Sequence, residues 1–405
     1  MTPVIRWGVV VVLVGHGLIH LLGAGKGLGW VEASALEESI SPGLGILWLL
    51  AAALVLLSAG LIAARAPTTW WWAVALGAAA VSQVAVVTSW SDAKLGTVVN
   101  VLLVVAAVYG FASVGPVSFH AQWATQSAQA LDEAEHSIAL VTEADLADLP
   151  EPLADFVRRS GAVGQPHISS FAATFHGRIR GGPTQAWMPF TGRQVNTFGP
   201  RPQRHFIMDA TRSGLPVTVL HRYANGTATM RAKVVSLVSV VNAAGAAMDR
   251  GETVTVFNDL VAFAPGAIVD APIRWTAVDG THVHGVFSVG AQSVSGVLTF
   301  DDDHHLVDFV SQDRSRASSD GKSFTAMPWS TPLAGHLDVR GHLVPLEGEA
   351  RWDAPAPEGS FTYVELKIED VAYNLTRVDD IGASARQLSE ADGPARSRTA
   401  ARALP

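Results

Sequence analysis

The 405 residues carry 28 Lys and Arg against 36 Asp and Glu, a net charge of −8. Residues 1–131 hold four basic and four acidic side chains, so 24 basic and 32 acidic residues lie further along the chain. This acidic remainder argues against a nucleic-acid partner, because phosphates require a basic patch. The chain contains no cysteine, which excludes disulfides, thiolate metal sites and a cysteine nucleophile.

Four apolar segments near the N-terminus are long enough to cross a bilayer, which takes about 20 residues. The second and third contain no charged residue. Eight of the twelve tryptophans lie before residue 124, and indole rings favour the headgroup layer at the ends of spans. We therefore expect a multi-pass protein of the cell (plasma or inner) membrane, with the lipid bilayer as a partner. The predicted spans cover residues 7–25, 43–64, 70–90 and 95–114.

The orientation of the spans is weakly determined by the charges that flank them. Four spans place both chain ends on one side, where Arg6 and Arg65 lie, whereas Lys26 and Lys94 lie on the other. The two sides carry equal numbers of basic residues, so the positive-inside rule does not decide the orientation. Because Arg6 and Arg65 are tightly flanked by spans, we expect both ends, and with them the soluble domain, to be cytoplasmic, but the side stays open.

Polar residues interrupt the spans within one half of the bilayer. His16 and His20 are four residues apart and share one helix face. Intramembrane ionisable groups mark functional sites, but hydrogen bonds between helices would produce the same pattern. We expect either a proton relay or a pocket for a small polar ligand, with interhelical hydrogen bonding as the alternative. The predicted cluster consists of His16, His20, Gln83, Asp92 and Asn100.

We expect no cofactor in the spans. A haem held by two histidines needs ligands on opposing helices, and the second, third and fourth spans contain neither His nor Met. A haem would therefore need a second subunit.

The remainder of the chain predicts an antiparallel β domain. Residues 116–148 are poor in large apolar groups and predict a helical or disordered linker. Residues 149–377 alternate apolar and polar positions, as in YVELKIED, and are punctuated by turn pairs that favour hairpins. We expect about ten strands there, and residues 378–405 predict a disordered tail. The turn pairs are Asn225-Gly226, Asp279-Gly280, Asp320-Gly321 and Arg340-Gly341.

One helix interrupts this series of hairpins. In ETVTVFNDLVAFAPG, residues 252–266, apolar side chains such as Val254, Phe257 and Val261 follow helical spacing. A helix inside a long antiparallel meander favours a curved sheet or half-barrel wrapped over it. Such a half-barrel encloses an apolar groove, which suits an apolar or amphipathic ligand. The predicted fold class is α+β, a four-helix transmembrane bundle followed by this β domain.

A metal-assisted hydrolase is the rival interpretation. No GxSxG elbow, phosphate loop, dinucleotide fingerprint or HExxH motif occurs, so we lean against an enzyme. His282 and His284 nevertheless alternate onto one strand face, and His305 could join them from a neighbouring strand as a metal ligand. Histidines two residues apart on a wet sheet face are also commonly solvent-facing.

Several stretches spread over most of the chain carry a family resemblance. They are GHGLIHLLG (15–23), SWSDAKLGT (89–97), LPEPL with SGAVGQP (149–166), AWMPF (186–190), MRAK (230–233), GHLVPLEGEARW (341–352) and AYN (372–374). In these stretches the chain resembles an uncharacterised bacterial membrane-protein family with four N-terminal helices and a C-terminal domain of unknown function.

This resemblance implies that the two parts belong together, and it supplies no catalytic residues. Relatives carry basic residues just after the fourth span, which would place that end in the cytoplasm, whereas here none occurs before Arg158. The strand pattern also looks like the lipoprotein-carrier half-barrel, which implies a lipid-like or lipoprotein ligand.

Overall fold

The computed structural model describes residues 3–34, 36–64, 70–135, 137–318 and 322–378. The chain forms two compact units, one containing the N-terminal helices and one containing most of a large sheet. The predicted disordered tail, apart from Val378, lies outside the described residues, as does the predicted turn at Asp320-Gly321.

The N-terminal helices follow the four apolar segments. They are α1 (Pro3–Gly27), α2 (Pro42–Ala63), α3 (Trp71–Thr88), the short α4 (Trp90–Ala93) and α5 (Gly96–Val114). By length and composition α1, α2, α3 and α5 are suited to crossing a membrane. The membrane type and the side of the soluble domain remain predictions.

Small residues let α1 and α2 approach closely. A Cβ atom added to Gly27 would lie 2.7 Å from the Cα of Gly45, so the two backbones meet where neither residue has a side chain. At the start of α2, Ser41 lies at the cap position and its hydroxyl accepts a hydrogen bond from the Leu44 amide. Small residues at contacts and a capped helix end are both typical of packed membrane helices.

Short helices precede the sheet. They are α6 (Phe119–Glu133), the 3₁₀ helix η1 (Glu143–Leu146) and α7 (Glu151–Arg159). In α6, Trp123 is buried and its indole nitrogen donates a hydrogen bond to the His205 carbonyl at 3.0 Å. This hydrogen bond links α6 to β3 through the buried indole.

The β domain has more strands than the sequence predicted, sixteen within the described residues instead of about ten. Several are only two or three residues long, which hydrophobic alternation cannot register. They are β1 (Ser170–Ile179), β2 (Met188–Thr197), β3 (Gln203–Arg212), β4 (Leu215–Ala224), β5 (Thr227–Val234), β6 (Val238–Ala244), β7 (Ile273–Ala277), β8 (His282–Val289), β9 (Gln292–Phe300), β10 (Leu306–Ser311), β11 (Ser315–Ala317), β12 (Phe324–Ala326), β13 (Trp329–Ser330), β14 (Leu333–Val339), β15 (His342–Asp353) and β16 (Ser360–Tyr373).

All strands except β11 and β12 form one long antiparallel sheet, and the chain's last strand, β16, lies in the middle of the strand order. The order is β6-β5-β4-β3-β2-β1-β16-β15-β13-β10-β9-β8-β7, with β14 paired to β15. β16 joins the two halves because it pairs with β1 on one side and β15 on the other. β11 and β12 form a separate two-stranded sheet.

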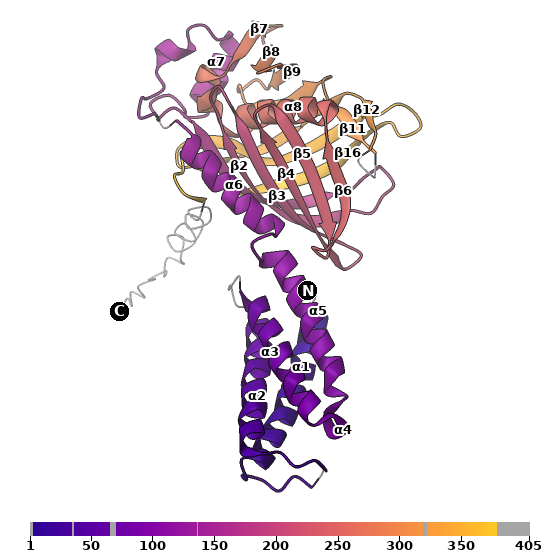
Figure 1. Cartoon of the computed structure of the whole chain (residues 1–405). Coiled ribbons are helices and arrows are strands. Elements are labelled where there is room, and N and C mark those ends of the chain that lie inside the picture. The colour runs from indigo at the N-terminus through magenta and orange to yellow at the C-terminus, as the bar shows by residue number, and fades with distance from the viewer. Residues whose placement is uncertain (1–2, 35, 65–69, 136, 319–321, 379–405) are drawn as a thin grey trace, which may run out of the picture. The chain divides into compact units, whose positions relative to one another are not determined.

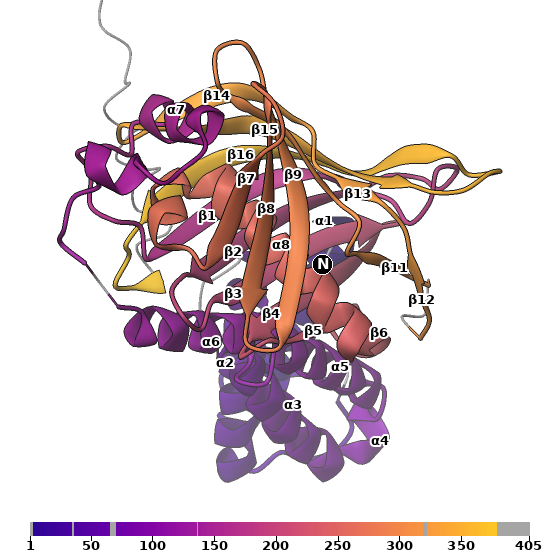
Figure 2. The same cartoon turned by 90° about the horizontal axis from the view of Figure 1, so that it is seen from above.

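The long sheet curls around the helix α8 (Ala246–Phe263), which is followed by the 3₁₀ helix η2 (Pro265–Asp270) (Figure 1). Seen from above, α8 lies inside the curve, between β7–β9 and the strands β1–β5 (Figure 2). The predicted fold class is therefore confirmed, namely four apolar helices followed by a curved antiparallel half-barrel over one helix.

Aromatic rings fill the space between α8 and the strands β8–β10. Phe257 is fully buried, and its ring centroid lies 5.1 Å from that of Phe309 and 5.6 Å from that of Phe287. Glycines make room for these rings, since a Cβ atom on Gly296 would lie 2.4 Å from the Phe309 ring and one on Gly285 would lie 2.7 Å from Phe257. The predicted apolar stripe on this helix is thus part of the core.

Candidate functional site

Two carboxylates of α8 are buried inside the half-barrel. Every residue from Gly251 to Ala262 is buried, so this helix has no solvent-facing side for its polar residues. The side chains of Glu252 and Asp259 are only 3% and 6% exposed. An unpaired charge in such surroundings would be strongly destabilising, so the partners of these carboxylates determine whether the helix can occupy its position.

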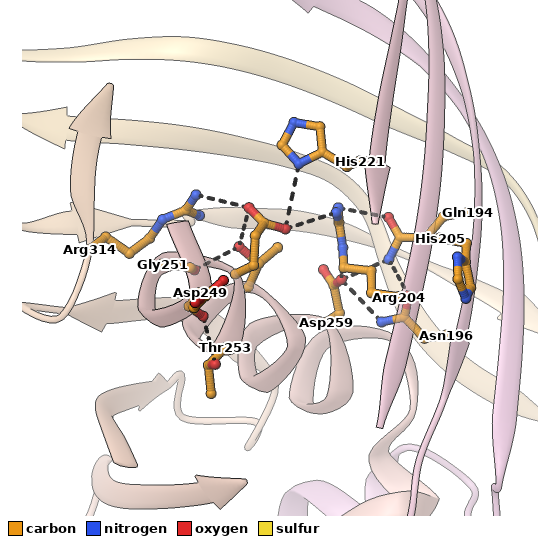
Figure 3. A network of polar contacts seen from close by, with 12 residues as sticks. Gln194, Asn196, Arg204, His205, His221, Asp249, Gly251, Thr253, Asp259 and Arg314 are labelled. Carbon is orange, nitrogen blue, oxygen red and sulfur yellow. Dashed lines mark hydrogen bonds and ion pairs between the residues drawn. The ribbon is translucent and has the colours of Figure 1, made fainter. Parts of the chain in front are cut away.

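Arg204 of β3 joins the two carboxylates. Its Nε atom donates to Asp259 Oδ2 at 2.7 Å, and its Nη1 atom lies 3.2 Å from Glu252 Oε2 (Figure 3). Glu252 and Asp259 are seven residues apart, which is about two helical turns and puts both on one face of α8. Burial lowers the pKa of Arg204, but Asp259 and Glu252 outweigh that effect and raise the pKa above its ordinary value.

The sheet supplies the remaining hydrogen bonds to Asp259. Gln194 and Asn196 of β2 donate to Asp259 Oδ2 at 2.7 and 3.1 Å, and Arg204 Nη2 donates to Gln194 Oε1 at 3.2 Å. Gln194 and Asn196 share one face of β2 because they are two residues apart, and Asn196 is paired directly with Arg204 across the strands. The register of β2 and β3 therefore brings three donors onto one carboxylate.

Glu252 has two further neighbours that can carry positive charge. His221 Nδ1 of β4 and Arg314 Nη2 each lie 3.6 Å from the Glu252 carboxylate. Burial raises the pKa of Glu252, but the charges of His221, Arg204 and Arg314 outweigh burial and hold the pKa well below its ordinary value. We call Gln194, Asn196, Arg204, His221, Glu252, Asp259 and Arg314 the α8 network.

The contacts of the α8 network hold the helix against the sheet. Each carboxylate is matched by cations or amide donors from other elements, and the resulting links run from α8 to β2, β3 and β4. The expected groove beneath the curved sheet is therefore not purely apolar, because a helix with carboxylates fills it. Sequence reasoning identified the apolar residues of this helix and missed the network, whose signal was the pair of carboxylates inside an otherwise apolar stretch.

A cavity of about 950 Å³ lies at the end of α8, within the unit that contains most of the sheet. Its walls come from the β2–β3 connection, the end of α8, η2, β8 and the segment after α6. The apolar lining includes Ile168, Phe198, Leu260, Ala267, Pro272 and Phe287. The polar lining includes Glu133, His167, Arg201, Gln203 and Asp270.

The polar cluster expected within the helices is largely assembled. Ser82 Oγ donates to Asn100 Oδ1 at 2.7 Å, so the Ser82 oxygen accepts the hydrogen bonds that connect it to His20 Nε2 at 2.7 Å and His16 Nε2 at 3.0 Å. Asn100 in turn donates to Gln83 Oε1 at 2.9 Å. Ser82 was not predicted, because serine is common in apolar helices and gives no distinct signal.

Asp92 lies in a different contact. Its Oδ2 atom accepts a hydrogen bond at 2.9 Å from the backbone amide of Glu38, in the connection between α1 and α2. The Lys26 ammonium donates to the carbonyl of the same residue. Asp92 therefore ties together two connections between helices, because an unpaired backbone amide there attracts its carboxylate more directly than a distant imidazole.

Two of the three histidines proposed as metal ligands have separate acidic partners. His282 Nδ1 lies 2.9 Å from Asp279, and His305 Nδ1 lies 3.2 Å from Asp301. The ring of His305 also stacks on that of His336, with centroids 3.9 Å apart. In the part of the chain that the structure describes, no group of three or more His, Asp or Glu side chains is placed to hold a metal ion. The set His282, His284 and His305 therefore stays a sequence prediction.

The first prediction concerns the Arg204 charge. Arg204→Met should lower the free energy of unfolding by about 3–5 kcal/mol, because it leaves buried carboxylates without their shared cation. Adding Asp259→Leu should recover part of that loss, since Glu252 keeps His221 and Arg314 as neighbours. The matched control is Arg178→Met, which breaks the exposed Arg178–Glu365 pair and should leave the stability almost unchanged, because exposed ion pairs contribute little. Equal losses of unfolding free energy in the two single variants, measured by denaturant unfolding in mild detergent, would contradict the role of Arg204 in holding α8 against the sheet.

The second prediction concerns His205, which is buried on β3 next to the network residue Arg204. Burial lowers the pKa of His205 to about 4, and the charges of Arg222 and Arg204 add to this effect. Between the ordinary value of 6.5 and about 4, only the unfolded chain binds the proton, so this contribution to stability is complete above pH 6.5 and is lost as the pH falls. The free energy of unfolding should drop by about 1–3 kcal/mol between about pH 7.5 and about pH 5 through this group. In His205→Gln the drop should be smaller by that amount, and an unchanged pH dependence would disprove the assignment.

Comparisons with known proteins identify the family. No curated protein matches the chain. Solved structures that are similar include a DUF1329 family protein from Desulfovibrio piger (12% identity, 56% of this chain and 93% of that chain, TM-score 0.33). Another is a LolA superfamily protein from Nitrosomonas europaea (12% identity, 56% of this chain and 94% of that chain, TM-score 0.29). The model of a family of unknown function, DUF6544, matches residues 139–366, which confirms the resemblance to an uncharacterised family. The chain therefore belongs to the DUF6544 family.

Proposed function

We propose that the β domain binds an amphipathic, lipid-like or lipoprotein ligand in the cavity at the end of α8. The observation that carries this proposal is the cavity itself, whose volume of about 950 Å³ is in the range of roughly 300–1,000 Å³ typical of ligand sites. Its lining combines buried apolar side chains with exposed charged ones.

The apolar lining suits a hydrocarbon portion of the ligand. The apolar wall that a ligand could cover comes from Phe198, Pro200 and Pro272, which are half-buried or exposed, whereas Ile168, Leu260 and Phe287 are almost completely buried. Covering such a wall with an acyl chain would gain about 25 cal/mol for each Å² of apolar surface removed from water. This wall supports an apolar tail as the part of the ligand that supplies most of the affinity.

The charged lining suits a polar head on the same ligand. His167 Nδ1 lies 2.5 Å from Asp270 Oδ2, and Gln203 donates to Glu133 at 3.0 Å. Hydrogen bonds from Gln129 and Gln203 hold the pKa of Glu133 below its ordinary value, so that this carboxylate is ionised. With Arg201 also in the lining, both signs of charge are available, which favours an amphipathic molecule over a plain hydrocarbon.

The third prediction tests this cavity with a photoactivatable fatty acid as the probe. The full chain in nanodiscs should form adducts on peptides that contain Phe198 or Leu260. Ala271→Trp should reduce these adducts severalfold, because Ala271 is a half-buried part of the lining and an indole there fills volume that a ligand needs.

The matched control is Ala291→Trp, which places the same bulk on the exposed β8–β9 turn and should leave the adducts unchanged. Adducts confined to the apolar helices, or an equal yield in both variants, would reject the cavity as the ligand site.

We infer a second role, proton transfer within the apolar helices, from the continuity of the hydrogen bonds there. The chain of donors runs from His20 through Ser82, Asn100 and Gln83 to Thr97, with steps of 2.7, 2.7, 2.9 and 3.1 Å. Proton relays in membranes use ionisable side chains such as histidine, and the ionisable members of this cluster are His16 and His20, both bonded to Ser82. Interhelical hydrogen bonding without proton transfer remains the competing explanation.

The fourth prediction separates these two explanations. In proteoliposomes containing a pH-sensitive dye, the wild-type chain should pass protons faster than empty vesicles do. Ser82→Ala removes the central link and should reduce the flux to that of empty vesicles. Ser58→Ala is the matched control, because Ser58 is equally buried but its hydroxyl bonds only to the Leu54 carbonyl of its own helix. Wild-type flux no higher than that of empty vesicles would reject the relay.

A further inference from the structure

Two neighbouring hairpins of the sheet end in exposed apolar side chains. In the sheet order β3, β4, β5 and β6 are adjacent, so the β3–β4 and β5–β6 turns lie at the same end of these antiparallel strands. The amide of Val235 donates to the carbonyl of Pro216 at 2.8 Å, which fixes the two ends side by side. We call residues 211–218 and 233–239 the hairpin tips.

The hairpin tips expose side chains that water does not favour. Leu215, Leu237 and Val238 are 50%, 48% and 57% exposed. Single exposed apolar residues need no explanation, whereas a group on one edge indicates a contact surface. Both turns are tight, since Ser213 and Gly214 in one and Val235 and Ser236 in the other have positive φ. The apolar residues therefore lie directly at or next to the turns.

The charge around the hairpin tips is opposite to that of the remainder of the domain. Residues 205–244 contain four basic residues and one acidic residue, Asp209, whereas the part of the chain after residue 131 has 24 basic and 32 acidic residues. Arg212 and Lys233 lie within the hairpin tips. Apolar side chains flanked by basic ones match the interface of a membrane with anionic lipids, where each Lys or Arg near the surface adds about 1 kcal/mol.

The chain itself keeps this edge within reach of a bilayer. Trp123, which is hydrogen-bonded to His205 in β3, comes nine residues after Val114, the last residue of the apolar helix α5. Nine residues span at most roughly 30 Å, and a ten-residue strand is about as long. A lipid surface is thus a partner that the connection to α5 keeps near the sheet.

We propose that the hairpin tips insert Leu215, Leu237 and Val238 into the headgroup layer of the bilayer, with the exposed Arg212 contacting anionic lipid. The occupant is a lipid surface. A second protein, including another copy of this chain, would bury the same side chains without bringing them to lipid. This surface is separate from the cavity, so either proposal can fail alone.

The fifth prediction uses the absence of cysteine from the chain. Leu237→Cys, labelled with the environment-sensitive fluorophore NBD, is placed in nanodiscs of phosphatidylcholine and phosphatidylglycerol. Interfacial side chains sink roughly 5–10 Å into the headgroup and acyl boundary, so emission should shift to the blue. A doxyl label near the headgroup end of the acyl chains should quench roughly half of it at that depth. Ala291→Cys on the β8–β9 turn, which lies toward the opposite end of the sheet order, is the control and should show neither change.

Two results would overturn the proposal. Emission from the Leu237→Cys probe equal to that of the control would show that the tip stays in water. A blue shift without doxyl quenching would show burial against protein. Adding Arg212→Glu, an exposed position, should reduce the quenching in discs with phosphatidylglycerol and leave it unchanged in discs of phosphatidylcholine alone. Equal quenching of both variants in both lipids would overturn the role assigned to the basic residues.

Discussion

The β domain depends on one buried arginine. The curved sheet can close around α8 only if the two carboxylates of that helix are neutralised, and Arg204 reaches both of them while Gln194 and Asn196 complete the hydrogen bonds to Asp259. Buried ion pairs of this kind add less stability than well-packed apolar residues would. Their effect here is positional, because the register of β2 and β3 and the rotation of α8 must both be correct for the contacts to form.

The cavity is attached to this network through neighbouring residues. Asp259 precedes Leu260 and Asn196 precedes Thr197, and the second residue of each pair lines the cavity. Gln203, which precedes Arg204, also lines it and holds Glu133. The interactions that fix α8 against the sheet therefore also fix one wall of the cavity. A ligand site bounded in this way is largely preformed, which reduces the ordering cost of binding.

The sequence predicted those features that periodicity and composition record. Apolar stretches longer than about 20 residues predict helices of membrane length, and the spacing of Val254, Phe257 and Val261 predicted the helix inside the half-barrel. His16, His20, Gln83 and Asn100 were predicted to gather because depth along a membrane helix follows from residue number. Asp92 was predicted in the same cluster, whereas in the structure its carboxylate accepts a hydrogen bond from the Glu38 amide, a contact that residue number does not reveal. Strand number, the α8 network and the cavity depend on which distant strands become neighbours, and β1 meets β16 across almost two hundred residues.

The two buried polar systems differ in a way that bears on function. In the β domain, opposite charges face one another at 2.7–3.6 Å and each is held by several partners, so a change in protonation would leave a buried charge unpaired. Among the apolar helices the partners are imidazole, hydroxyl and amide groups, each of which both donates and accepts hydrogen bonds. Imidazole and hydroxyl groups exchange donor and acceptor roles by moving a proton, whereas an amide does so only by rotating its side chain. The ion pairs are therefore suited to holding a helix in place, whereas the neutral hydrogen bonds can be rearranged without leaving a buried charge unpaired.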